Sequence, residues 1–154
     1  MINPQDYTVL VAEDDDYLRK IFIQQLEEKG FSTLVATEGR ELYEKAKSFP
    51  RENLEYLVIV SDTDMPCGDG DVMCRQLLQE EMFKKVIILG MSGDSHNEEY
   101  WENIGVWQTF IYKGEAISEQ SSFADKIINR INSIVNQPQF YLLSDGTYRR
   151  SINR

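Results

Sequence analysis

Residues 56–70 read YLVIVSDTDMPCGDG, an apolar run that stops at two polar residues and continues into a glycine-rich turn. A short apolar run bounded by turn signals is typical of a strand buried on both faces of a sheet. In open α/β sheets, ligands bind at the carboxyl ends of such strands. Asp62 directly follows the run, which makes it a candidate nucleophile or metal ligand. On this segment alone, Asp62 and Asp64 fit loop capping equally well.

Apolar runs and helical patterns alternate along most of the chain. The sequence predicts five strands, at 8–12, 31–36, 56–60, 86–89 and 107–112. Apolar residues spaced three and four apart predict helices between Asp16 and Gly30 and at 39–49, 71–79, 95–101 and 122–136. The fourth of these is expected to begin with a capping box formed by Ser95 and Glu98. Strands separated by helices imply a parallel sheet with right-handed crossovers. We therefore predict an α/β fold, a single doubly wound (βα)5 domain of flavodoxin-like type with strand order 2-1-3-4-5.

The end of the chain follows a different pattern. Residues 1–137 are predicted to form the α/β domain, and residues 138–154 a separate C-terminal tail. In the tail, an Asp145-Gly146 turn between two apolar or aromatic runs predicts a β-hairpin. An isolated hairpin is only marginally stable in water, so it packs on the domain, packs on a partner or stays disordered. The sequence does not choose among these.

Composition excludes several classes of protein. The net charge of −10 disfavours direct binding to nucleic acid or to an anionic membrane, because both need a basic surface. No apolar run approaches the roughly 18 residues of a membrane span, and the N-terminus lacks the pattern of a signal peptide. Cys67 and Cys74 show no metal-ligand spacing with the single histidine, His96. We expect reduced thiols and a cytoplasmic location.

Polar residues follow four of the five predicted strands. Glu13 and Asp14 follow the first strand, Asp62 the third, Ser92 the fourth and Lys113 the fifth. Because parallel neighbours lie about 4.8 Å apart, the three carboxylates are expected to share one pocket. Carboxylates so close repel one another and favour a bound cation. Oxygen ligands with room for water suit Mg²⁺.

These residue types together predict phosphoryl transfer. A carboxylate such as that of Asp62 can attack phosphorus and form an acyl phosphate. A metal ion stabilises the charge of the attacked group. The Ser92 hydroxyl can donate a hydrogen bond to one phosphoryl oxygen, and the Lys113 ammonium can neutralise another.

Over Thr8 to about Val135 the sequence resembles the receiver domain of two-component response regulators. VLVAEDDDYLR (9–19) is similar to the acidic-pair motif of that family, and SDTDMPCGDG (61–70) to its phosphorylation-site motif. VIILGMSGD (86–94) resembles the strand with the family's hydroxyl residue, and TFIYKG (109–114) the strand that ends in its lysine. Four motifs in the family's order make the resemblance specific.

The resemblance implies a role for each matched residue. It identifies Asp62, four residues before Pro66, as the phosphoryl acceptor, with Ser92 and Lys113 assisting. The implied Mg²⁺ ligands are Glu13, Asp14, Asp62 and the backbone carbonyl of Asp64. Ser92 and Phe110 are the implied switch residues. The implied partner is a histidine kinase or a phosphotransfer protein, and the chain would be a stand-alone signalling domain rather than an enzyme. The face formed by the helix at 95–101, the strand at 107–112 and the last helix would serve for homodimerisation.

The sequence departs from the family at Gly114, where a proline is usual after the lysine. Asp64 and Asp94 lie at positions that the resemblance associates with the rate of phosphoryl loss. Two alternatives remain open at this stage. One is a docking module that keeps the fold without phosphorylation. The other is a haloacid-dehalogenase-type phosphatase that uses Asp62 and Asp64, although the acidic metal pair of that class follows its nucleophile whereas here it precedes Asp62.

Overall fold

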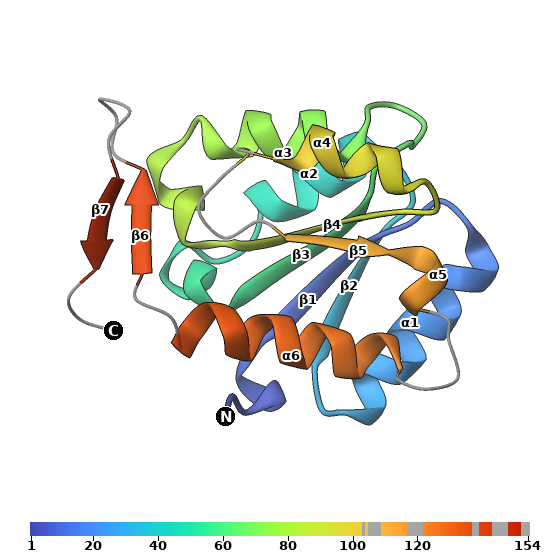
Figure 1. Ribbon diagram of the computed structural model, residues 1–154, viewed down its shortest axis with the longest axis horizontal. Helices are drawn as coiled ribbons and strands as arrows, with labels where there is room; N and C mark the ends of the chain where they lie inside the picture. The colour runs from blue at the N-terminus through green and yellow to red at the C-terminus, as the bar shows by residue number, and fades with distance from the viewer. Residues whose placement is uncertain (103, 105–108, 117–121, 137–138, 143–147, 152–154) are drawn as a thin grey trace.

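The computed structural model describes residues 1–102, 104, 109–116, 122–136, 139–142 and 148–151. Its central sheet has five parallel strands in the order β2-β1-β3-β4-β5, which confirms the predicted fold (Figure 1). The strands are β1 (Thr8–Ala12), β2 (Ser32–Ala36), β3 (Leu57–Asp62), β4 (Ile87–Ser92) and β5 (Thr109–Tyr112).

Helices cover both faces of the sheet (Figure 1). The α-helices are α1 (Asp16–Glu28), α2 (Gly39–Lys47), α3 (Gly70–Leu78), α4 (Glu98–Trp101), α5 (Lys113–Ala116) and α6 (Phe123–Asn136). Four 3-10 segments complete the described helical structure, η1 (Pro4–Asp6), η2 (Arg51–Tyr56), η3 (Glu81–Lys85) and η4 (Ser95–Asn97). None of the described helices combines the length and the apolar composition needed to cross a bilayer.

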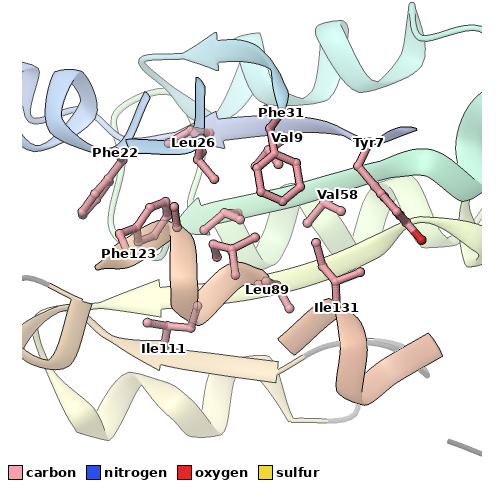
Figure 2. Close-up of a cluster of buried hydrophobic side chains, with 14 of the residues drawn as sticks. Tyr7, Val9, Phe22, Leu26, Phe31, Val58, Leu89, Ile111, Phe123 and Ile131 are labelled. Carbon is pink, nitrogen blue, oxygen red and sulfur yellow. The ribbon is translucent and has the colours of Figure 1, made fainter. Parts of the chain in front are cut away.

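Alternate residues of the strands point to opposite faces of the sheet and build two cores. On one face, Val9 and Val58 pack with residues of α1 and α6, where the rings of Phe22 and Phe123 stack with centroids 4.0 Å apart (Figure 2). On the other face, residues such as Ile59 pack with α2, α3 and α4. Because β3 lies in the middle of the sheet, every residue of it is buried, as its continuous apolar sequence predicts.

The central strand is longer at its carboxyl end than predicted. It continues through Ser61 and Asp62, which pair in register with Ala12 of β1 and Met91 of β4. The neighbouring strands supply backbone partners to these two polar residues, so polarity does not end the strand. Asp62 is therefore held at the end of the sheet by regular backbone pairing on a buried strand.

The segment after β4 also differs from the prediction. The expected capping box does not form, because Asp94 rather than Ser95 is the cap, and its side chain accepts a hydrogen bond from the backbone N–H of His96. The predicted single helix is a turn of 3-10 helix followed by the four-residue α4. The first two residues of the predicted fifth strand, 107 and 108, lie outside the described residues.

The C-terminal strands β6 (Gln139–Leu142) and β7 (Tyr148–Ser151) pair antiparallel with each other. The Asp145-Gly146 turn predicted between them lies outside the described residues. The division of the chain into a domain at 1–137 and a tail stays a prediction.

Candidate functional site

The acidic pocket lies at the carboxyl edge of the sheet, where β1 and β3 end side by side. Ligand oxygens of Glu13, Asp14 and Asp62 all lie within 4.8 Å of one another, as expected from the strand order. Glu13 is fully buried, Asp62 is 7% exposed, and Asp14 is exposed to solvent. These groups lie close together because β1 and β3 are neighbouring strands and each group lies at, or just after, the carboxyl end of one of them.

Lys113 extends from the end of β5 into the same pocket. Its Nζ lies 2.7 Å from Oε2 of Glu13 and 3.1 Å from Oδ2 of Asp62. Its side chain is 15% exposed, so both ion pairs are largely shielded from water. Backbone N–H groups hold the other carboxylate oxygens: Asp15 donates to Oε1 of Glu13 and Thr63 to Oδ1 of Asp62.

The charges in the pocket are not balanced, because one ammonium group faces two buried carboxylates. Burial and, next, the neighbouring Glu13 charge raise the pKa of Asp62 to about 7, although the Lys113 ammonium opposes the shift. Burial also raises the pKa of Glu13, although Lys113 opposes the shift. Burial lowers the pKa of Lys113, but its contacts with Glu13 and Asp62 outweigh this effect and raise the pKa overall. A further cation would relieve this repulsion.

The pocket fits a divalent metal ion. Among the described residues, two buried side-chain polar atoms make no hydrogen bond of good geometry, and Oε2 of Glu13 is one of them. The cation beside this oxygen is the Lys113 ammonium. Three carboxylates with one open to solvent match the preference of Mg²⁺ for a few carboxylate ligands and several waters. The residues would therefore accommodate the ion that the sequence predicts.

Ser92 lies at the end of β4 and is 4% exposed. Its Oγ accepts hydrogen bonds from the side-chain amide of Asn97 at 2.9 Å and from the backbone N–H of Asp94 at 3.0 Å. The same Asn97 amide donates to Oδ2 of Asp64 at 3.2 Å. Ser92 thus lies on the edge that carries Asp62, as predicted, but its hydrogen-bond network with Asn97 and Asp64 was not predicted.

A second hydrogen-bond network, between uncharged groups, links α4 to the residue after Asp62. The indole N–H of Trp101 donates to Oγ1 of Thr63 at 2.8 Å, and that hydroxyl donates to the backbone carbonyl of Met91 at 2.9 Å. Thr63 directly follows Asp62, and Trp101, the last residue of α4, is 1% exposed. Nothing in the sequence links position 101 to position 63.

Phe110 and Gly114 are the remaining predicted residues of interest. Phe110 in β5 is half-buried against the α2–α4 core and pairs in register with Gly90 of β4. The described chain contains no cis peptide bond, so the Lys113-Gly114 bond is trans. A Cβ atom at position 114 would lie 2.5 Å from the ring of Tyr112. At position 114, where the family usually has proline, the ring of Tyr112 occupies the space that a side chain would need.

Comparison with known proteins identifies the family. The sequence model of the response regulator receiver domain matches residues 9–119, almost three quarters of the chain. The chain belongs to this family. Among curated relatives, the hybrid signal transduction protein dokA of Dictyostelium discoideum is 31% identical over 101 residues, which cover 64% of this chain and 6% of dokA. The chain spans between 6% and 56% of the length of the curated relatives it matches.

Solved structures of receiver domains share the fold. A response regulator from Chloroflexus aurantiacus superposes with a TM-score of 0.66 at 20% identity, over 85% of this chain and 98% of that one. The CheX-CheY-BeF3-Mg complex from Borrelia burgdorferi gives a TM-score of 0.63 at 20% identity, over 85% of this chain and 90% of that one. The family model confirms the predicted family, and these structures confirm the fold. Neither comparison favours the phosphatase or the docking-module alternative.

Proposed function

We propose that this receiver domain accepts a phosphoryl group on Asp62 in a Mg²⁺-dependent reaction and signals through a change of conformation at Ser92 and Phe110. The observation that carries the proposal is the pocket itself. A buried carboxylate at the centre of the sheet edge lies beside two further carboxylates and a lysine ammonium 3.1 Å away. The phosphoryl donor would be a histidine kinase or a phosphotransfer protein.

In the proposed reaction, a carboxylate oxygen of Asp62 forms a bond to phosphorus while the bond from phosphorus to the donor's leaving atom breaks. The leaving group keeps the electron pair and takes up a proton. Lys113 is placed to neutralise charge on the incoming group, and Ser92 to donate a hydrogen bond to a phosphoryl oxygen. Because Asp62 has a pKa of about 7, it is only partly ionised at neutral pH.

Glu13, Asp14, Asp62 and the backbone carbonyl of Asp64 would hold the metal ion. When bound, the ion would favour the ionised form of Asp62 and stabilise charge on the phosphoryl group. The Borrelia CheY structure with beryllofluoride and magnesium supports the proposal by likeness of fold. The expected homodimer face, made by α4, β5 and α6, and the cytoplasmic location stay predictions.

A phosphorylation assay tests the acceptor. The protein is incubated with Mg²⁺ and acetyl phosphate, and intact mass is expected to increase by one phosphoryl group. Asp62→Asn should abolish the increase, whereas Asp64→Asn should keep it because Asp64 does not lie at the end of the buried strand. Modification that persists in Asp62→Asn would reject the site, and no modification of the native protein would reject the function.

A further inference from the structure

The side chain of Asn97 connects the end of β4 with the loop that follows Asp62. It is 9% exposed, and it is the last residue of η4, which lies between β4 and α4 in the chain. Its Nδ2 donates to Oγ of Ser92 at the end of β4 and to Oδ2 of Asp64 in the loop after β3. One amide group therefore bridges a residue of the proposed switch and a residue of the proposed phosphorylation loop.

The partners of Asn97 fix which end of its amide faces the pocket. An ionised carboxylate such as that of Asp64 only accepts hydrogen bonds, so the group that faces it must be the NH₂ of the amide. The same NH₂ faces Ser92. The side chain makes no capping bond to α4, although Asn97 is the residue that precedes that helix.

The hydrogen bonds of Ser92 determine what its hydroxyl can still do. A hydroxyl has two lone pairs and one proton. The amide of Asn97 and the backbone N–H of Asp94 occupy both lone pairs of Oγ. The hydroxyl of Ser92 can therefore make one further hydrogen bond, in which it donates its proton. Phosphoryl oxygens accept hydrogen bonds, so this is the state that a phosphorylated Asp62 needs.

We propose that Asn97 is a positioning residue that presets the Ser92 hydroxyl to donate to a phosphoryl group on Asp62. This proposal rests on the proposed function. Asp64 contributes by holding the amide in the orientation that offers NH₂ to Ser92. Asn97 itself acts through Ser92 and needs no contact with the phosphoryl group.

A double-mutant cycle tests the proposal, with the affinity for beryllofluoride in saturating Mg²⁺ as the measured quantity. Asn97→Ala should weaken binding about fivefold, the effect expected from losing one hydrogen bond. In the Ser92→Ala background, the same substitution should change binding less than about twofold, because there is no hydroxyl left to orient. Mg²⁺ affinity, measured without beryllofluoride, should remain within about twofold of the native value in Asn97→Ala.

Two further variants complete the design. Asn97→Asp keeps the size of the side chain but replaces the donor with an acceptor that binds the Ser92 proton. It should weaken beryllofluoride binding more than Asn97→Ala does, and it keeps the test open if the alanine variant does not fold. Ser95→Ala, an exposed neighbour in η4, is the matched control and should bind as the native protein does.

The outcomes are distinct. Native-like binding by Asn97→Ala, or an equal loss with and without the Ser92 hydroxyl, would overturn the positioning role. If both Asn97 variants fail to fold, the residue is structural and the proposal also fails. Native protein that binds no beryllofluoride in Mg²⁺ would instead overturn the proposed function, and this inference with it.

Discussion

The two sides of the pocket are built from different forces. On the side of β1, β3 and β5, Glu13, Asp62 and Lys113 form buried ion pairs in which the charges are not balanced. On the side of β4 and α4, the amide of Asn97 donates to Ser92 and the indole of Trp101 donates to Thr63, so uncharged donors and close packing dominate. On the charged side, the two buried carboxylates repel each other. On the neutral side, the polar side chains have hydrogen-bond partners. The groups proposed to react therefore lie on β1, β3 and β5, whereas the residues proposed to orient them lie on β4 and in the segment that follows it.

The largest expected effect comes from removing the single buried cation of the charged side. Lys113→Met should lower the free energy of unfolding of the metal-free protein by about 4 kcal/mol at pH 8, because two buried carboxylates then have no partner. The loss should be smaller at pH 5, where the carboxylates take up protons. Urea unfolding at the two pH values measures the difference.

The exposed lysine of α1 provides the control for that substitution. Lys20→Met removes one positive charge from the surface and should change stability by less than about 0.5 kcal/mol. A Lys113→Met protein as stable as Lys20→Met at pH 8 would show that the buried ion pairs do not hold the charged side together.

The next prediction concerns close packing on the neutral side. A Cβ atom at Gly90 would lie 2.2 Å from the ring of Trp101, which is fully buried and has no room to move away. Gly90→Ala should therefore cost about 3 kcal/mol of unfolding free energy, the upper end of the usual range for overpacking. Thermal or urea unfolding measures it.

Gly93→Ala is a matched control three residues further along the chain. A Cβ atom at position 93 would meet nothing within 4 Å, so its stability should stay within about 0.5 kcal/mol of the native value. Equal destabilisation by the two alanines would mean that Trp101 does not pack as closely on β4 as the structure shows.

The same division separates what could be predicted from sequence. Glu13, Asp14, Asp62 and Lys113 each follow an apolar strand, and strand order alone brings strand ends together. Asn97 carries no such signal, because it lies in an irregular turn and its partners are 5 and 33 residues away. The failure of the Ser95-Glu98 capping box has the same origin: Asp94 is an equally good cap one residue earlier, and local preferences did not distinguish them.

The carboxyl end of β3 shows another limit of local patterns. Ser61 and Asp62 are polar, which predicts the end of a strand, yet backbone pairing with β1 and β4 extends it through both residues. Such pairing depends on neighbours that are distant in sequence. The position of Asp62 at the sheet edge was predicted; its place within the strand was not.

The next prediction concerns the effect of pH on the charged side. Asp62 has an ordinary pKa near 4 when unfolded and about 7 in the folded metal-free protein, so the folded state binds its proton more tightly. Its contribution to stability is full below about pH 4 and is lost as the pH rises through about 7. Asp62→Asn, which cannot ionise, should therefore be more stable than the native protein by up to about 4 kcal/mol at pH 8, the equivalent of about three pKa units, and by little at pH 4.

Addition of Mg²⁺ at pH 8 should reduce that difference, because the ion stabilises the native protein by mass action and binds the variant less well. Unfolding titrations of both proteins from pH 4 to 8, with and without Mg²⁺, provide the measurement. A difference between them that is constant with pH would contradict the raised pKa of Asp62.

The smallest expected effect tests the hydrogen bond that joins the two sides. Trp101→Phe keeps an aromatic ring but removes the indole N–H that donates to Thr63, the residue next to Asp62. We expect a loss of about 1 kcal/mol in unfolding free energy, the usual net value of one hydrogen bond. In a Thr63→Val background the acceptor is already gone, so the same change should cost clearly less. An undiminished cost there would assign the effect to ring packing, and the neutral side would then be coupled to Asp62 through Asn97 and Ser92 rather than through Trp101.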